Sequence, residues 1–239
     1  SFDFPESLVE IGAYAFDMCE KLSGEIRLEK NLVYVGKQAF GSTNLTDLYY
    51  NIPHLTNSGG LTYTEAFQNM GNGGFKNITI GNDVKVLTDG VFTEQKAVET
   101  IVIPDSVEII GTSAFRNCTS LKNLTISDSV TEIGIKAFEG CASLTEFTVP
   151  KNVKSLGKDV LKKCTSLKNL TISDSVTEIG IGAFEGCTSL TEFTVPKNVK
   201  SLGKNAIPKT ITTVYFNAEN CEFYYPENEN VSPCSESSI

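Results

Sequence analysis

The sequence lacks several residue types and patterns that mark common functional classes. It has no tryptophan, one histidine and two methionines in 239 residues. Its apolar runs are a few residues long, far below the roughly 18 apolar residues that a membrane-spanning helix needs. His54 would have to serve any histidine-dependent catalytic device, and no Gly-x-Ser-x-Gly elbow, Walker loop or dinucleotide fingerprint occurs. We therefore expect neither direct membrane insertion nor catalysis.

Positive charge is also scarce. The chain has 20 basic and 29 acidic residues, a formal net charge of -9 at pH 7. Nucleic acids and anionic lipids are bound by clustered lysine and arginine, so neither is expected as a partner. Residues 217–239 contain five acids and no base. A solvated acidic end is the simpler interpretation of this tail, and a cation or partner site is the alternative.

The chain does contain a repeat. Residues 119–164 recur as residues 165–210 with seven changes in 46 positions, and this block is itself two units of 23. One apolar position marks every unit: Phe16, Phe40, Phe67, Phe92, Phe115, Phe138, Leu161, Phe184 and Ile207. The spacing is 23 from Phe92 onward and 24 to 27 before it. Such a period predicts stacked structural units.

Each unit follows the pattern L-x-x-φ-x-φ-x-x-S-V-x-x-I-G-x-x-A-F-x-x-C, where φ is apolar. Residues 121–126 alternate around β-branched side chains, which predicts a short strand. A second extended piece, residues 130–133, stops at Gly134, and the recurrence of this glycine indicates a backbone angle that other residues resist. The Ala-Phe segment that follows is predicted to form a single helical turn.

A unit of this size cannot bury its apolar residues alone, so neighbouring units must stack and pair strand to strand. We predict a β-dominated, right-handed stack of about nine coils over residues 1–216. Residues 217–239 are predicted to be a C-terminal cap and acidic tail, with residues 223–226 over the end of the core. Residues 2–4 match the middle of a coil, so we expect a mature form or part of a longer chain.

The pattern resembles the BspA-type leucine-rich repeats. The residues that carry the resemblance include Ile110-Gly111, Ala114-Phe115 and Cys118, and the same set recurs one unit later from Ile133 to Cys141. The resemblance covers roughly residues 1–216 and implies a leucine-rich-repeat solenoid. It also implies a secreted or cell-surface location and adhesion to host matrix proteins or other cells.

The repeat is least regular between residues 51 and 75. This region holds Gly59-Gly60 and residues 71–74 of sequence Gly-Asn-Gly-Gly, and Thr62-Tyr63 replaces the usual apolar-Gly pair. Insertions in a solenoid become surface loops. A tolerated bulge is the simpler interpretation, and a loop that contacts a ligand is the alternative.

The cysteines are mostly part of the repeat. Five lie three residues after the marker position: Cys19, Cys118, Cys141, Cys164 and Cys187. This placement predicts small buried core residues, and the lack of C-x-x-C pairs argues against a metal site. Cys221 and Cys234 stand outside the ladder and could form a disulfide in an oxidising compartment, with free thiols an equal alternative. No cofactor or metal is expected.

The concave face of the strand sheet is the best candidate binding surface, because alternate strand residues point outward. One predicted outward column contains Arg27, Tyr49, Thr79, Val102, Thr125, Thr148, Thr171, Thr194 and Tyr215. The second contains Glu25, Asp47, Asn77, Thr100, Asn123, Glu146, Asn169, Glu192 and Thr213. Threonine is also simply a good strand residue. Tyr and Arg are enriched in binding hot spots, whereas Tyr50 is predicted to point inward.

Three functions fit these observations. The first is a non-catalytic module at the cell surface that binds a protein or glycan through the concave face and the 51–75 region. The second is a structural spacer in a larger surface protein, since the C-terminal units are near-identical duplicates. The third and weakest is a hydrolase that uses surface carboxylates.

Overall fold

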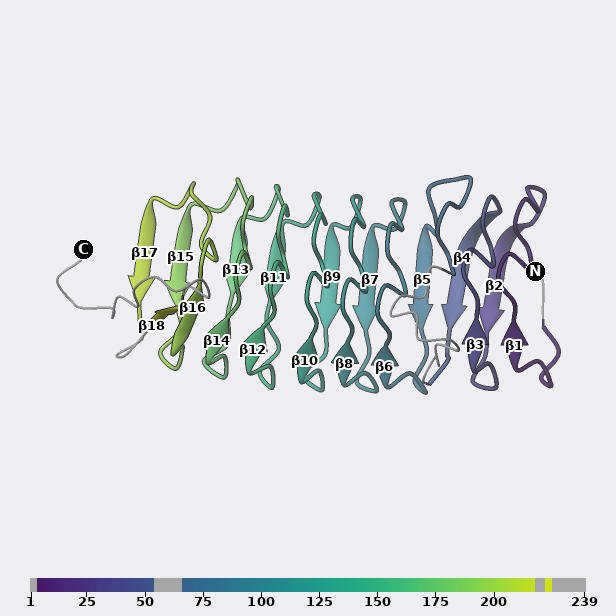
Figure 1. Cartoon of the computed structure of the whole chain (residues 1–239), viewed down its shortest axis with the longest axis horizontal. Helices are drawn as coiled ribbons and strands as arrows, with labels where there is room; N and C mark the ends of the chain where they lie inside the picture. The colour runs from purple at the N-terminus through teal and green to yellow at the C-terminus, as the bar shows by residue number, and fades with distance from the viewer. Residues whose placement is uncertain (1–3, 54–65, 218–221, 225–239) are drawn as a thin grey trace.

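The computed structural model describes residues 4–53, 66–217 and 222–224, and over these residues the chain is a single stack of parallel strands. Figure 1 shows the coils in one row from the N-terminus to the C-terminus. Strands of successive coils form two faces of the stack. The long-strand face carries the longer strand of each coil, and the short-strand face carries the shorter strand.

The long-strand face contains nine strands in the described chain. They are β2 (Ser23–Leu28), β4 (Asn44–Tyr50), β5 (Asn77–Ile80), β7 (Thr100–Ile103), β9 (Asn123–Ile126), β11 (Glu146–Thr148), β13 (Asn169–Thr171), β15 (Glu192–Val195) and β17 (Thr213–Phe216). Strand pairing is parallel and keeps the repeat in register, so Ile101 faces Leu124 and Phe147 faces Leu170. Nine strands on one face enclose about eight full turns, close to the nine coils expected from the sequence.

The short-strand face is built in the same way. Its described strands are β1 (Glu10–Ile11), β3 (Tyr34–Val35), β6 (Val86–Leu87), β8 (Ile109–Ile110), β10 (Glu132–Ile133), β12 (Ser155–Leu156), β14 (Glu178–Ile179), β16 (Ser201–Gly203) and β18 (Glu222–Tyr224). The backbone of β18 pairs in parallel with β16 and so continues this sheet. The rest of the predicted cap, residues 218–221 and 225–239, lies outside the described residues, so the cap stays a prediction.

The core is a continuous column between the two faces. Phe40, Phe92, Phe115 and Phe138 are fully buried. The rings of Phe115 and Phe138 lie 5.4 Å apart and are parallel within 1°. The marker rings from Phe16 to Phe138 therefore pack on one another from coil to coil, as the period requires. The column also continues through the described end of the irregular region, because the Phe67 ring lies 5.8 Å from that of Phe40.

The predicted helical turn is wrong, since the described residues contain no helix. Gly90, Phe92 and Glu94 donate their backbone N–H groups to carbonyls of the next coil at 2.7 to 2.8 Å. Val91 and Thr93 instead donate to carbonyls three residues back in their own coil. An α-helix needs every N–H to bond to the carbonyl four residues back. Here alternate donors are used between coils, so the segment forms a third intercoil ladder.

This ladder uses left-handed backbone at two positions in each of five successive coils. Gly90 and Glu94 have φ of 65° and 63°. The same pair of positions has positive φ in the next four coils, at Ser113 and Asn117, Lys136 and Gly140, Asp159 and Lys163, and Gly182 and Gly186. Left-handed backbone is costly for most side chains. The unit therefore accepts local strain to make hydrogen bonds with its neighbours.

The recurrent glycine has a different role from the one predicted. Gly134 and Gly203 have no left-handed φ, yet a β-carbon on Gly134 would lie 2.5 Å from the backbone nitrogen of Thr112. A β-carbon on Gly203 would lie 2.4 Å from the backbone nitrogen of Ile181. The constraint is the close approach of adjacent coils rather than a backbone angle.

Replacing Gly134 by alanine should therefore destabilise the stack by about 1–3 kcal/mol, because backbone atoms of two coils would have to separate. The measurement is the midpoint of urea denaturation followed by circular dichroism. Gly12 occupies the same position in the first described coil, but nothing lies within 4 Å of its added β-carbon. Gly12→Ala is the matched control and should leave the midpoint nearly unchanged. Equal shifts for both variants would contradict the close-approach explanation.

Candidate functional site

The structure aligns the two predicted columns on the long-strand face. Arg27 faces Tyr49, which faces Thr79. Further cross-strand pairs in that column are Val102 with Thr125, Thr148 with Thr171, and Thr194 with Tyr215. In the second column Glu25 faces Asp47 and Asp47 faces Asn77, followed by Thr100 with Asn123, Glu146 with Asn169, and Glu192 with Thr213.

Burial alternates along these strands. The residues between the columns, such as Ile26, Leu48 and Ile101, are buried. Arg27, Asp47, Tyr49 and Thr213 are half-buried, and the other column members are exposed. Tyr50 is fully buried against Phe92, as its inward position predicts. The sequence thus correctly places the columns at the surface, and their role in binding is still a prediction.

Arg27 makes three side-chain contacts at the N-terminal end of the face. Its guanidinium lies 3.1 Å from a carboxylate oxygen of Glu25 and 3.3 Å from one of Glu29. The guanidinium carbon also stacks 4.0 Å from the centre of the Tyr49 ring. These contacts occur because residues 25, 27 and 29 alternate along β2 and its end, and Tyr49 is the direct cross-strand neighbour. The Glu-x-Arg-x-Glu spacing is visible in the sequence, but Glu29 lies beyond the two predicted columns.

Asp47 is a second ordered charge beside this cluster. Its carboxylate accepts hydrogen bonds from the Thr46 hydroxyl at 2.5 Å and from the Asn77 side-chain amide at 2.6 Å. These two bonds, with that of Thr46 the larger cause, lower the pKa of Asp47 below its ordinary value. The carboxylate is therefore ionised at neutral pH and presents a fixed negative charge on the face.

The C-terminal half of the face is more uniform. The exposed columns there consist mainly of threonine, asparagine and glutamate, and Asn123 donates to the Thr100 hydroxyl at 3.3 Å across the strands. Val102 and Tyr215 are the large apolar exceptions, with about half of each exposed. The strand preference of threonine is sufficient to explain this column, so the N-terminal half offers the more distinctive surface.

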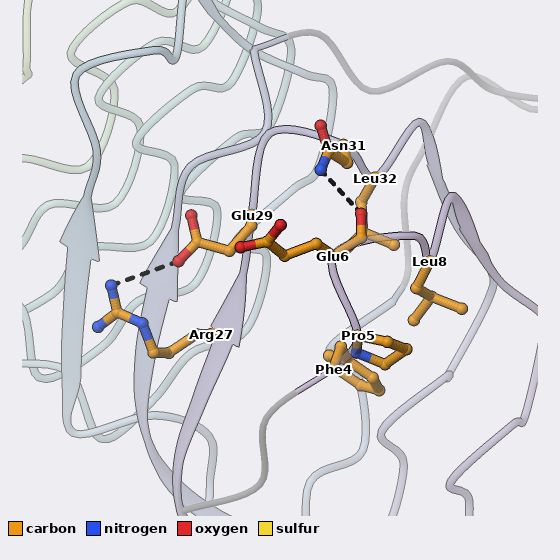
Figure 2. A pocket seen from close by; sticks show the side chains of 8 residues that line it. All are labelled: Phe4, Pro5, Glu6, Leu8, Arg27, Glu29, Asn31 and Leu32. Carbon is orange, nitrogen blue, oxygen red and sulfur yellow. Dashed lines mark hydrogen bonds and ion pairs between the residues drawn. The ribbon is translucent and has the colours of Figure 1, made fainter.

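A pocket of about 180 Å³ lies beside Arg27 (Figure 2). It is lined by Phe4, Pro5, Glu6, Leu8, Arg27, Glu29, Asn31 and Leu32. The Asn31 side-chain amide donates to the Glu6 backbone carbonyl at 2.8 Å and so links the two coils that line the pocket. Except for Arg27, these residues were absent from the predicted site, since they come from turns of two successive coils rather than from a strand column.

The repeated cysteines form a buried column, with one exception. The thiols of Cys118, Cys141, Cys164 and Cys187 are fully buried, and each donates to a backbone carbonyl of the preceding coil at 3.2 or 3.3 Å. The prediction is wrong for Cys19, which is exposed in the first described coil. Among the described residues no group of three or more histidine, cysteine or acidic side chains is arranged to hold a metal ion.

Three residues singled out from the sequence lie outside the described residues. These are His54, Cys221 and Cys234. Both alternatives for Cys221 and Cys234, a disulfide or free thiols, therefore stay open. Most of the irregular 51–75 region also falls there, whereas its described part includes the buried Ala66, Phe67 and Phe75. No described segment forms a helix long and apolar enough to cross a membrane.

Comparison with known proteins assigns the repeat. The model of the BspA-type leucine-rich-repeat region matches six copies over residues 1–96 and 85–214. The chain belongs to the BspA-type leucine-rich-repeat family. The sequence resemblance is thereby confirmed. No curated protein matched the chain.

Solved structures of the same class resemble this BspA-type chain. A leucine-rich-repeat protein from T. pallidum is 30% identical, with a TM-score of 0.55, over 59% of this chain and 66% of that one. The pneumococcal vaccine antigen PcpA is 19% identical, with a TM-score of 0.53, over 92% of this chain and 61% of that one. The second likeness concerns the fold alone. The chain thus spans just under two thirds of the length of either protein.

The four buried thiols should resist alkylation in the folded protein. Iodoacetamide followed by peptide mass mapping should label Cys19 at once, and Cys118, Cys141, Cys164 and Cys187 only after denaturant is added, because burial excludes both reagent and thiolate. Rapid labelling of any of the four in the native state would contradict the buried column.

The same burial predicts a loss of stability at alkaline pH. Burial raises the pKa of the Cys118 and Cys187 thiols from 9.0 to about 12. Above pH 9.0 the unfolded chain releases these protons while the folded chain keeps them. The free energy of unfolding should therefore be unaffected below that pH and fall above it by about 1.4 kcal/mol per pH unit for each such thiol.

Urea titrations between neutral pH and the folded-state pKa measure this slope. Cys118→Ala should flatten it relative to the unmodified protein by removing one titrating group. An identical slope in Cys118→Ala and the unmodified protein would exclude this thiol as a source.

Proposed function

We propose that this chain is a non-catalytic binding module of a cell-surface or secreted protein, with a protein or glycan ligand on the long-strand face. Membership of the BspA-type family and similarity to a protein described as a vaccine antigen support a surface location. Leucine-rich-repeat proteins generally bind proteins, which supports the class of partner. Glycans and host matrix proteins come from the family resemblance alone.

The observation that carries the proposal is the order of the N-terminal half of the face. Arg27 is held by two carboxylates and by the Tyr49 ring, and Asp47 is held by two hydrogen bonds. Side chains that are already fixed lose little conformational entropy when a partner binds. Tyr and Arg are also the residues that most often dominate binding energy. A rigid, polar, partly exposed cluster on a broad sheet is well suited to recognition.

The environment of Asp47 does not favour the hydrolase alternative. General acid catalysis near neutral pH needs a carboxyl group whose pKa is raised by burial or by a like charge. The pKa of Asp47 is lowered instead, and its oxygens are occupied by Thr46 and Asn77. A screen against ester, peptide and glycoside substrates would detect turnover if this interpretation is wrong.

A structural spacer is the second candidate, and the duplicated coils favour it. Ser129 and Ser175 donate to valine carbonyls of the preceding coil at 2.9 and 2.7 Å. Asn152 and Asn198 both donate to aspartate carbonyls at 2.7 Å. Coils with such equivalent hydrogen bonds lengthen the solenoid without adding a different surface for a ligand. We propose the spacer role for the C-terminal coils within a chain whose N-terminal coils bind.

The test is binding to a printed array of purified matrix proteins and glycans. The double variant Arg27→Ala/Tyr49→Ala should weaken the strongest array signal by about tenfold, a typical loss for one hot-spot pair. The matched control is Glu132→Ala/Glu178→Ala, which changes two exposed residues of the short-strand face and should leave the signal unchanged.

A signal that both double variants weaken equally would remove the long-strand face as the binding surface. The absence of any signal from the unmodified chain would favour the spacer role throughout. Circular dichroism of both variants checks that the stack is intact.

A further inference from the structure

The pocket beside Arg27 has two chemically distinct walls. Phe4, Pro5, Leu8 and Leu32 form an apolar wall. In the view of Figure 2 the Glu6 side chain extends toward Glu29, above Phe4 and Pro5. A ligand that fills this space must therefore satisfy apolar surface and negative charge within one group.

The charge of this region is not balanced internally. Arg27 is the only cation that lines the pocket, and both Glu25 and Glu29 already share it. Glu6 adds a further carboxylate to the wall. Among the described residues of the two outward columns, Arg27 is likewise the only base, against the acids Glu25, Asp47, Glu146 and Glu192. The two columns thus carry a surplus of negative charge, and Glu6 and Glu29 add two carboxylates at the pocket.

This surplus argues against an anionic occupant. A phosphate, sulfate or carboxylate would have to compete with Glu25 and Glu29 for the single guanidinium, and it would be repelled by Glu6. A bare metal ion would gain nothing from the apolar wall. A lysine or arginine side chain satisfies both walls, because its methylene stem packs on apolar surface while its charged end remains at the rim.

We propose that this pocket receives a lysine or arginine side chain from a basic segment of a protein partner that docks on the long-strand face. The proposal rests on the proposed binding function and makes it more specific. The stem would contact Phe4, Pro5 and Leu8, and the charged end would lie between Glu6 and Glu29. The partner's neighbouring basic residues would then lie over Glu25 and Asp47, which continue the acidic surface along β2 and β4.

The first test uses a short synthetic peptide of alternating lysine and serine, and its counterpart with glutamate in place of lysine, in isothermal titration calorimetry at physiological salt. The lysine peptide should bind and the glutamate peptide should not. The double variant Glu6→Gln/Glu29→Gln should weaken binding by about tenfold, the effect of losing one well-placed charge contact.

Overall negative charge alone could attract the lysine peptide, so a matched control removes the same charge elsewhere. Glu132→Gln/Glu178→Gln neutralises two exposed carboxylates of the short-strand face and should change the affinity less than about twofold, because salt screens distant charges. Equal loss in both double variants would overturn the proposal in favour of attraction by net charge.

The apolar wall is tested with a third peptide, in which diaminopropionate replaces lysine. This residue keeps the cation but lacks three methylene groups of the stem. It should bind about tenfold more weakly to the unmodified protein, given the usual benefit of burying methylenes. The weakening should shrink in Leu8→Ala, whose fold is checked by circular dichroism. Equal affinity of the two cationic peptides would show that the stem is not received by a pocket.

These outcomes separate the pocket from the broader function. If array binding still depends on Arg27 and Tyr49 while the lysine peptide is indifferent to Glu6 and Glu29, the pocket proposal fails and the binding function stands. If peptide binding depends on Glu6 and Glu29 but array binding is unchanged by the Arg27 and Tyr49 substitutions, the pocket proposal stands and the proposed site of array binding fails.

Discussion

The structure depends on close, parallel contact between successive coils. Many backbone N–H groups of a coil donate hydrogen bonds to the neighbouring coil. They do so in the strand pairs of both faces and in the segments equivalent to residues 90–94. Glycines such as Gly134 and Gly203 permit this approach, because a β-carbon would meet the backbone of the adjacent coil. The marker phenylalanines of neighbouring coils can then stack, as Phe115 and Phe138 do with ring centroids 5.4 Å apart. The fold is thus a one-dimensional array in which each coil is stable only against another.

Much of this architecture can be predicted from the sequence, because a fixed period puts the same side chain in the same environment in every coil. The strand positions, the buried Phe column and the outward columns follow from alternation and spacing. The prediction of a helical turn was wrong because it rested on the local helix propensity of the Ala-Phe segment. That propensity carries no information on the hydrogen bonds that Gly90 and Glu94 donate to the next coil. The burial predicted for Cys19 was wrong. Cys19 lies in the first described coil and is exposed there, unlike the cysteines of the later coils.

The candidate site was only partly predictable for a related reason. Arg27 and Tyr49 lie in strand columns, so the period identifies them, and their stacking follows from direct cross-strand pairing. Glu6 and Leu8 belong to a turn whose position relative to Arg27 depends on how two coils meet, which no spacing rule gives. The residues that distinguish this chain from an ideal array are therefore those that the repeat describes least well. Recognition is expected at such departures, since identical coils present identical surfaces.

The stacking itself is tested most directly by a distance across several coils. Spin labels on cysteines introduced at Thr79 and Thr194, in a background where Cys19, Cys221 and Cys234 are serine, lie five coils apart in one outward column. Pulsed electron resonance should give a narrow distribution centred at about 24 Å plus the label linkers, from a strand spacing of about 4.8 Å. A broad distribution, or a mean far from that value, would contradict the shared register on which the fold and the binding face depend.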